Sequence, residues 1–308
     1  MNKKIDPIDF IGQTPVVKLK KIVSDQVADV YVKLESFNLA GSVKDRVAKA
    51  MILEAEAAGK LQSDTVIVEA TSGNTGVALA AIGALKGYEV IIALSESVSQ
   101  ERKQLIRAYG ATVIETPAEK GVQGSFDVVA EYLAKGPRYF SVSQFTNPAN
   151  PLIHEQTTGV EISDFFAGKA PTVFVAGIGT GGTITGVGHH LKKIDPKTKI
   201  VAVEPEDSAV LTGGTPGSHI IQGIGAGFIP EVLDRALLDE VYDVSGEAAR
   251  KTAQRLGKEE GLLVGFSSGA AVYAAIKEAE KLAPGQSVLA IAPDNGERYL
   301  STTLYEKE

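Results

Sequence analysis

The sequence predicts an α/β fold with two parallel-sheet-rich α/β domains and a functional site in the cleft between them. Short β-branched apolar runs alternate with helical periods along almost the whole 308-residue chain. These runs are nearly continuous, which is typical of parallel strands covered on both faces. The length suffices for two domains of ordinary size, and clefts between such domains commonly hold ligands.

The strands are predicted from short β-branched runs and the helices from four-residue apolar spacing. In the first helix Val43, Val47, Met51 and Ala55 recur every four positions, and Gly59 follows as a stop. The predicted strands are 30–35, 65–69, 89–94, 112–115, 139–143, 172–176, 199–204 and 288–292, and the predicted helices are 43–58, 77–85, 99–109, 125–135, one that ends at Lys193, and 270–282.

A proline-rich stretch, Asn147-Pro-Ala-Asn-Pro151, is the best candidate for a domain boundary. Two prolines within five residues are expected to interrupt both helix and strand. We therefore predict domains over 1–146 and 147–308. The smaller, mobile part of the first domain is expected over roughly 36–146, and it is left open whether residues near 11–34 cross over to the other domain.

Composition excludes several classes of protein. The chain has no cysteine, which excludes disulfides, thiolate metal sites and a cysteine nucleophile. The net charge of −7 argues against nucleic acid as the main partner. The amino-terminal segment has no apolar signal region and no long apolar run follows, so we expect no membrane partner and a cytoplasmic location. His154 lacks a second histidine at zinc-helix spacing, and no metal site is predicted.

The strongest local motif is a Gly- and Thr-rich loop, Gly177-Ile-Gly-Thr-Gly-Gly-Thr183, between a predicted strand and a predicted helix. Glycines allow close backbone approach, and N–H groups at a helix start favour an anion. A phosphate cradle is therefore predicted. The same segment satisfies a dinucleotide fingerprint, with Glu204 placed as a ribose-binding acid. A nicotinamide-dependent (NAD) dehydrogenase thus stays open as an alternative, although the fingerprint lies unusually late in the chain.

Two further polar loops follow predicted strands. The first, Thr71-Ser-Gly-Asn-Thr-Gly76, has more small and polar residues than one helix cap requires, and it is predicted to bind an anion such as a carboxylate. The second, Gly265-Phe-Ser-Ser-Gly269, is equally well explained as a cap. Physical chemistry alone does not distinguish Lys44 from the other lysines, because it lies on what looks like a solvated charged face.

Taken together, the motifs resemble those of the cysteine synthase (O-acetylserine sulfhydrylase) family and the similar catalytic core of cystathionine β-synthases. The resemblance covers nearly the whole chain and implies a pyridoxal 5′-phosphate enzyme of fold type II. It rests on Ile11–Pro15, Ser42–Arg46, Thr71–Gly76, Gln144-Phe145, Gly179–Thr183, Ile221–Pro230, Ser267–Gly269 and Asp294–Tyr299, which occur in the family's order.

The resemblance implies a role for each matching residue. Lys44 matches the catalytic lysine that binds the cofactor covalently and later takes the Cα proton. Asn74 matches the residue that bonds the cofactor's ring oxygen, and Ser267 the neutral hydroxyl that faces the pyridine nitrogen. A neutral partner makes the ring a weaker electron sink, which favours loss of a β-leaving group. The phosphate cradle matches Gly179, Thr180, Gly181, Gly182 and Thr183, and the substrate carboxylate site matches Thr71, Ser72, Thr75 and Gln144.

The implied reaction is β-replacement on O-acetylserine, or a similar activated serine, with sulfide to give L-cysteine. Homocysteine as the nucleophile, giving cystathionine, is the alternative. Three positions depart from the family pattern: Leu39 replaces a usual proline, 94–97 replaces a Met-Pro turn, and Val122 replaces a Met that resembles a substrate-facing wall. The first two are expected to alter loops around the cleft and not the chemistry. Val122 bears on the choice of nucleophile, whereas the stretch 221–228 looks more like cysteine synthase. The shorter Val122 leaves room for a bulkier thiol. The resemblance further implies a homodimer and a possible serine acetyltransferase partner.

Overall fold

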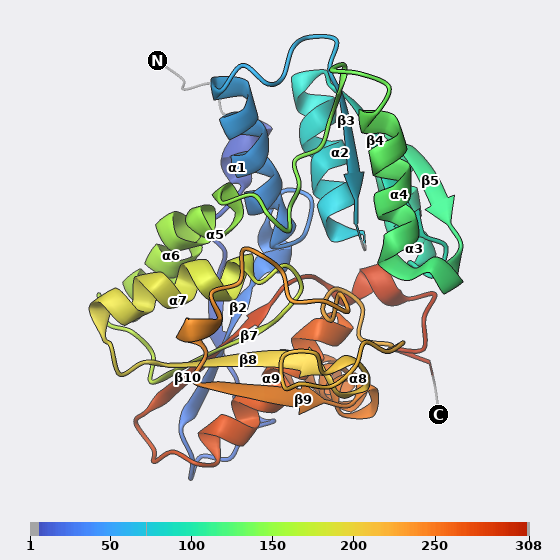
Figure 1. Cartoon of the computed structure of the whole chain (residues 1–308). Coiled ribbons are helices and arrows are strands. Elements are labelled where there is room, and N and C mark those ends of the chain that lie inside the picture. Colours follow the sequence, from blue (N-terminus) through green and yellow to red (C-terminus); the bar gives the residue numbers. More distant parts are fainter. Residues whose placement is uncertain (1–5, 72, 307–308) are drawn as a thin grey trace.

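This computed structural model describes residues 6–71 and 73–306, and within them the chain forms two sheets surrounded by helices (Figure 1). A six-stranded sheet has the order β1-β2-β10-β7-β8-β9, and a four-stranded sheet has the order β5-β4-β3-β6. Every pairing between these strands is parallel except that of β1 with β2. The predicted α/β fold with parallel sheets is confirmed.

The six-stranded sheet takes strands from both ends of the chain. β2 pairs in parallel with β10, with Val30 opposite Val288 and Leu34 opposite Ala292. The segment near 11–34 therefore enters the sheet formed by the carboxyl-terminal half. Division of the chain into domains at residue 147 stays a prediction. The strands are β1 (Val16–Lys18), β2 (Asp29–Leu34), β7 (Val173–Gly177), β8 (Lys199–Pro205), β9 (Glu240–Val244) and β10 (Ser287–Ala292).

The four-stranded sheet is built from the first half of the chain and lies in the upper part of Figure 1. Its central strands are mostly apolar and buried, as the continuous apolar runs predict, with Glu69 as a buried polar exception in β3. The strand predicted over 139–143 is only two residues long, and the Ser141 hydroxyl that follows it donates to Glu69 Oε2 at 2.6 Å. The strands are β3 (Val66–Ala70), β4 (Glu89–Ser95), β5 (Thr112–Thr116) and β6 (Tyr139–Phe140).

Helices cover both sheets, and three of them begin earlier than predicted. Asn74, Thr75 and Gly76 form the first turn of a helix, as do Ser267 and Ser268. Such residues satisfy their own backbone locally, so apolar periodicity underestimates the first turn. The helices are α1 (Lys44–Ala57), α2 (Asn74–Lys86), α3 (Gln100–Ala108), α4 (Gly121–Leu133), α5 (Ala149–Ile153), a π-helix (His154–Thr158), α6 (Gly159–Phe165), α7 (Gly182–Ile194), α8 (Gly246–Arg255) and α9 (Phe266–Ala279).

The proline-rich stretch does not interrupt the helix as expected. Pro148 is the N-cap of α5, and Pro151 lies within its first turn. Proline is tolerated there because the first N–H groups of a helix have no intrahelical partner. No candidate for β1, β9 or α8 was made from the sequence. β1 is only three residues long, and β9 carries the charged residues Glu240 and Asp243.

None of the helices in residues 6–71 and 73–306 is long and apolar enough to cross a lipid bilayer. The apolar side chains instead form cores on the faces of the two sheets.

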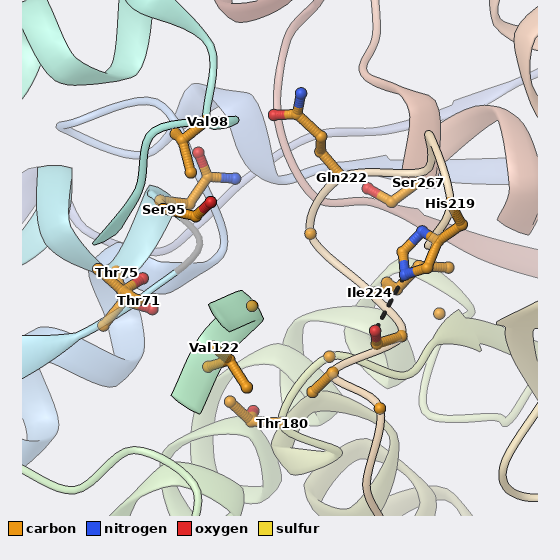
Figure 2. A pocket seen from close by; sticks show the side chains of 18 of the residues that line it. Thr71, Thr75, Ser95, Val98, Val122, Thr180, His219, Gln222, Ile224 and Ser267 are labelled. Carbon is orange, nitrogen blue, oxygen red and sulfur yellow. Dashed lines mark hydrogen bonds between the residues drawn. The ribbon is translucent and has the colours of Figure 1, made fainter. Parts of the chain in front are cut away.

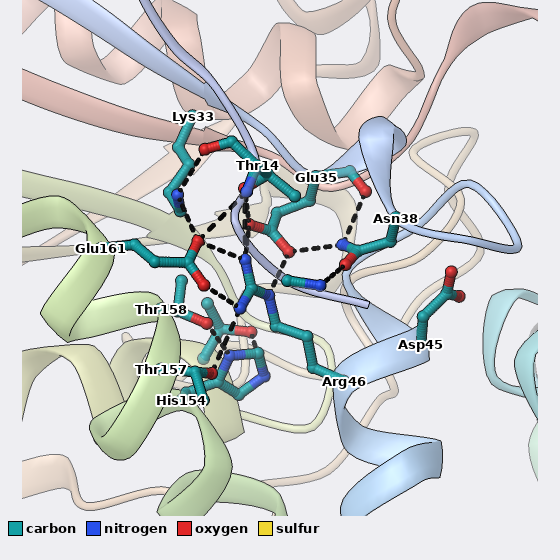
Figure 3. Close-up of polar contacts among 12 residues, drawn as sticks. Thr14, Lys33, Glu35, Asn38, Asp45, Arg46, His154, Thr157, Thr158 and Glu161 are labelled. Carbon is teal, nitrogen blue, oxygen red and sulfur yellow. Dashed lines mark hydrogen bonds and ion pairs between the residues drawn. The ribbon is translucent and has the colours of Figure 1, made fainter. Parts of the chain in front are cut away.

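A buried charge network ties α1 to β2 and α6 (Figure 3). Arg46 on α1 lies with Nε 2.7 Å from Glu35 Oε2 and Nη1 2.6 Å from Glu161 Oε1. Lys33 Nζ lies 2.8 Å from Glu161 Oε2. Burial alone would raise the pKa of Glu161, but hydrogen bonds and charge from Arg46, with the charge of Lys33, outweigh it and lower the pKa to about 2. The charges of Lys33 and Arg46 thus balance those of Glu35 and Glu161. Arg46 lies on the same helix as Lys44, close to it in the sequence.

We expect Glu161→Gln to destabilise the protein by about 3–5 kcal/mol near neutral pH, because it leaves a buried cation uncompensated. The depressed pKa means that this stabilisation is present above the ordinary glutamate pKa and lost as pH falls towards about 2. The difference from wild type should therefore shrink in acid, as measured by denaturant unfolding at several pH values. Glu280→Gln, in an exposed pair with Lys277, is the control and should change stability by under about 1 kcal/mol; equal losses in both variants would contradict the assignment.

Candidate active site

A cavity of about 780 Å³ opens between the two sheets. One wall comes from the four-stranded side, with Thr71, Thr75 and Val122, and the other from the six-stranded side, with Gln222 and Ser267 (Figure 2). Both walls are built at the carboxyl ends of parallel strands, where α/β proteins place their ligands. The location matches the predicted cleft.

Lys44 is the first residue of α1 and lines the cavity. The backbone before it is fixed to the end of β10, since Val43 N–H donates to Pro293 O at 2.9 Å and Ser42 forms a β-bridge with Asp294. Within the described residues the Lys44 ammonium has no hydrogen-bond or ion-pair partner. Burial lowers the pKa of Lys44 to about 8, against the opposing charge of Asp294. An amine with this pKa is neutral in part of the molecules near neutral pH, and is therefore nucleophilic.

The predicted phosphate cradle forms the turn between β7 and α7. Among the described residues, the main-chain N–H groups of Gly179, Thr180 and Gly181 have no acceptor. A Cβ on Gly179 would lie 2.6 Å from Gly223 O, and one on Gly182 would collide with the Asn150 side chain. Positions 179 and 182 therefore accept glycine only, and the N–H groups of the loop at the start of a 13-residue helix form an anion site.

Two residues of the preceding helical segment hold the threonines of this cradle. Asn150 Nδ2 donates to Thr180 Oγ1 at 2.9 Å, and His154 Nε2 lies 3.2 Å from Thr183 Oγ1. Burial lowers the pKa of His154 well below its usual value. The imidazole is thus neutral and contributes a hydrogen bond, not a charge, to the cradle.

The predicted carboxylate site is built on the opposite wall. The Thr75 hydroxyl donates to Gln144 Oε1 at 2.6 Å, and Gln144 Nε2 donates to Ala70 O at 3.1 Å. The main chain of Gln144 is held by the buried Glu69, which accepts its N–H at 3.2 Å. Thr71 lines the cavity beside them. A carboxylate here would meet hydroxyl and amide donors at the first turn of α2.

The structure brings most of the predicted site residues together. Gly181 and Gly182 shape the cradle from behind without lining the cavity, and Ser72 lies outside the described residues. The predicted residues that line the cavity are Lys44, Thr71, Asn74, Thr75, Gln144, Gly179, Thr180, Thr183 and Ser267.

Other cavity residues were given no role from the sequence. His219, Gln222 and Phe228 come from the loop after β8, whose many glycines indicated an irregular segment. Gln222 and Phe228 lie in the stretch Ile221–Pro230 that carries the resemblance, but no function was predicted for them. Ser95 and Val98, in the departure from the family pattern at 94–97 and next to it, also line the cavity. Their place follows from how the two sheets face each other, which periodicity does not encode.

The family model described as pyridoxal-phosphate dependent enzyme matches residues 8–294. The chain belongs to this family. Cysteine synthases of several Staphylococcus aureus strains are 51% identical to it over 304 residues, which is 98% of each chain. The solved cysteine synthase of Entamoeba histolytica superposes with a TM-score of 0.93 at 40% identity, covering 100% of this chain and 93% of that one. The O-acetylserine dependent cystathionine β-synthase of Helicobacter pylori superposes with a TM-score of 0.92 at 41% identity, covering 99% and 100%.

The residues of the cavity fit the family's cofactor. Lys44 has an amine without a partner in the described residues, the cradle has unused N–H groups, and the Ser267 hydroxyl likewise has no partner there. The dehydrogenase alternative is wrong. Glu204, its candidate ribose acid, is buried and accepts N–H groups from Leu211 and Thr212 at 2.9 Å each, so its carboxylate is already committed to the fold.

We expect Gly182→Ala to weaken pyridoxal phosphate binding by roughly tenfold or more, because the new Cβ displaces Asn150 and with it Thr180. Gly188→Ala is a matched control on the same helix, where the nearest atom would be Leu237 Cδ1 at 3.4 Å. It should leave cofactor affinity unchanged and raise stability by about 1 kcal/mol. Fluorescence titration of the cofactor-free variants measures both affinities; unaltered binding in Gly182→Ala would contradict the crowding argument.

Proposed function

We propose that the protein is a cysteine synthase that catalyses β-replacement on O-acetylserine, or a similar activated serine, with sulfide as the nucleophile. The observation that supports this most is the cavity itself. It is lined by the partly buried Lys44, whose pKa is lowered, by the phosphate cradle, and by Thr71 and Thr75 as groups for an amino-acid carboxylate. The S. aureus relatives with this activity are similar over nearly the full length of both chains.

Each predicted residue has a task that its surroundings support. Lys44 would hold the cofactor through Nζ and, when released, would take the proton from the substrate Cα, for which a pKa of about 8 is suitable. Thr71, Thr75 and Gln144 orient the substrate through its carboxylate. Pyridoxal phosphate, when bound, supplies the electron sink that stabilises negative charge at Cα. Asn74, which lines the cavity, would donate to the cofactor's ring oxygen.

Ser267 lines the cavity, and its neutral hydroxyl would contact the ring nitrogen of the bound cofactor. A hydroxyl does not hold a proton on that nitrogen as a carboxylate would, so negative charge at Cα is stabilised less. Loss of the β-substituent is then favoured over transamination. This supports replacement at Cβ as the reaction type.

Homocysteine is the alternative nucleophile, and Val122 is the observation that favours it. Val122 lies in the first turn of α4 and lines the cavity. Its short side chain leaves space that a longer residue would fill. The H. pylori relative, described as a cystathionine β-synthase dependent on O-acetylserine, has a similar structure.

We also propose a cytoplasmic homodimer whose smaller part, roughly 36–146, closes over the substrate. Exposed apolar side chains such as Phe37, 66% exposed, and Phe165, 46% exposed, are available for contact between two copies. A serine acetyltransferase is proposed as a further partner from the resemblance to the family. Gel filtration of the chain alone and mixed with that enzyme tests both proposals.

The proposed function is tested by steady-state assays with O-acetylserine and either sulfide or homocysteine. We expect a higher kcat/KM for sulfide, and a loss of roughly 10²–10⁴-fold or more in Lys44→Ala. Borohydride treatment followed by peptide mass spectrometry should place the cofactor on Lys44. A preference for homocysteine would replace the main proposal by the alternative, and an active protein without cofactor would refute both.

Val122→Met tests the size of the nucleophile site. We expect the longer side chain to lower kcat/KM for homocysteine by roughly tenfold while sulfide use stays within about twofold. Leu133→Met, an exposed position near the end of α4, is the control and should affect neither. Equal losses with both nucleophiles would show that Val122 does not sense thiol size.

A further inference from the structure

The Asn74 side chain is surrounded by three charged residues that no step of the reaction uses. Its Oδ1 accepts from Arg102 Nε at 3.1 Å and from Arg298 Nη1 at 2.7 Å. Its Nδ2 donates to Asp294 Oδ2 at 2.6 Å. Arg102, Arg298 and Asp294 are all at most 4% exposed, so these contacts are shielded from water.

The polarity of these contacts leaves the amide one orientation. A guanidinium only donates and a carboxylate only accepts. If the amide were turned over, its NH₂ group would face two cations and its oxygen would face a carboxylate. Unmatched contacts of this kind are costly in a buried site. One N–H of the Asn74 amide donates to Asp294, and the other has no acceptor in the described residues. Because Asn74 lines the cavity, a ligand there can accept from this second N–H.

The two arginines come from distant segments and are themselves fixed. Arg102, on α3, also bonds Gln222 and the Tyr299 hydroxyl, and its Cζ lies 4.5 Å from the centre of the Tyr299 ring. Arg298 Nη2 donates to Ala40 O. The Tyr299 hydroxyl donates to Asp294 Oδ2 at 2.7 Å, which closes the network.

Two glycines make room for the guanidinium groups. A Cβ on Gly73, directly before Asn74, would collide with Arg102 Cδ, and one on Gly41 would lie 2.7 Å from Arg298 Nη2. Both glycines have positive φ angles, +127° and +82°. The backbone on either side of the network is therefore shaped around the arginines.

We infer that Arg102, Arg298 and Asp294 are positioning residues that hold the Asn74 amide with one N–H group available to an acceptor in the cavity. This inference rests on the proposed function in one respect, the identity of the acceptor, which is the cofactor's ring oxygen. Two cations on the amide oxygen also draw charge from its nitrogen, which makes the N–H a stronger donor. Arg102 additionally contacts Gln222, so the same residue connects Asn74 with the opposite wall.

The absorption spectrum of the bound cofactor tests this, because it reports whether the ring oxygen is ionised. A strong donor favours the ionised, longer-wavelength form. In the holoenzyme we expect Arg102→Lys, which keeps the charge but has fewer donors than the acceptors it must serve, to shift the ratio of the two bands by roughly three- to tenfold towards the shorter wavelength. Arg107→Lys, on the exposed part of the same helix and paired with Glu115, is the control and should leave the ratio unchanged.

The double variant Asn74→Ala/Arg102→Lys separates positioning from a general structural role. If Arg102 acts through Asn74, its substitution should change nothing further once Asn74 is alanine. An additive shift, or none in Arg102→Lys alone, overturns the inference. If Arg102→Lys does not fold, Arg298→Lys replaces it in the test, because Arg298 donates to the same amide oxygen. The same shift is expected, and the same results would overturn the inference. The spectrum is independent of the nucleophile, so failure here and failure of the proposed reaction are distinguishable.

Discussion

Burial of the Lys44 amine without a close counter-charge is the constraint on which the rest of the site depends. A lysine removed from water loses part of the free energy that stabilises its ammonium form, and its pKa falls to about 8. The fold sustains this by fixing the backbone: α1 starts at Lys44, and Val43 is bonded to the end of β10. The reactive group therefore extends from a rigid helix end that is attached to the opposite sheet.

The two sheets contribute different chemistry to the cavity between them. The six-stranded sheet supplies the phosphate cradle after β7 and the Ser267 hydroxyl at the start of α9, while the four-stranded sheet supplies the hydroxyl and amide groups at the start of α2. Each anion site lies at a helix amino terminus, where N–H groups are unpaired and the helix dipole favours negative charge. A ligand with a phosphate and a carboxylate can thus bridge both sheets.

Charged residues in the interior divide into two networks with different consequences. The network of Lys33, Glu35, Arg46 and Glu161 is neutral in sum and fully hydrogen-bonded, and it supports the helix that carries Lys44. The network of Arg102, Arg298 and Asp294 carries an excess positive charge and lies against Asn74. Buried charges are costly to desolvate unless paired, so both networks are strong determinants of local geometry.

The sequence by itself determined the α/β class, the order of most strands and helices, and the polar loops at 71–76 and 177–183, because apolar periodicity and glycine- and hydroxyl-rich turns depend on local backbone geometry. The individual cavity residues Lys44, Gln144 and Ser267 were predicted from the resemblance to a family. The sequence did not determine the helix starts at Asn74 and Phe266, or the short strand β1. Nor did it single out Lys44 on physical grounds, since a charge on a helix reads as solvated. Only the tertiary structure decided that Lys44 is partly buried in the cavity wall, that Arg102 is buried, and that Glu204 is bonded to the backbone, because burial depends on segments far apart in the chain.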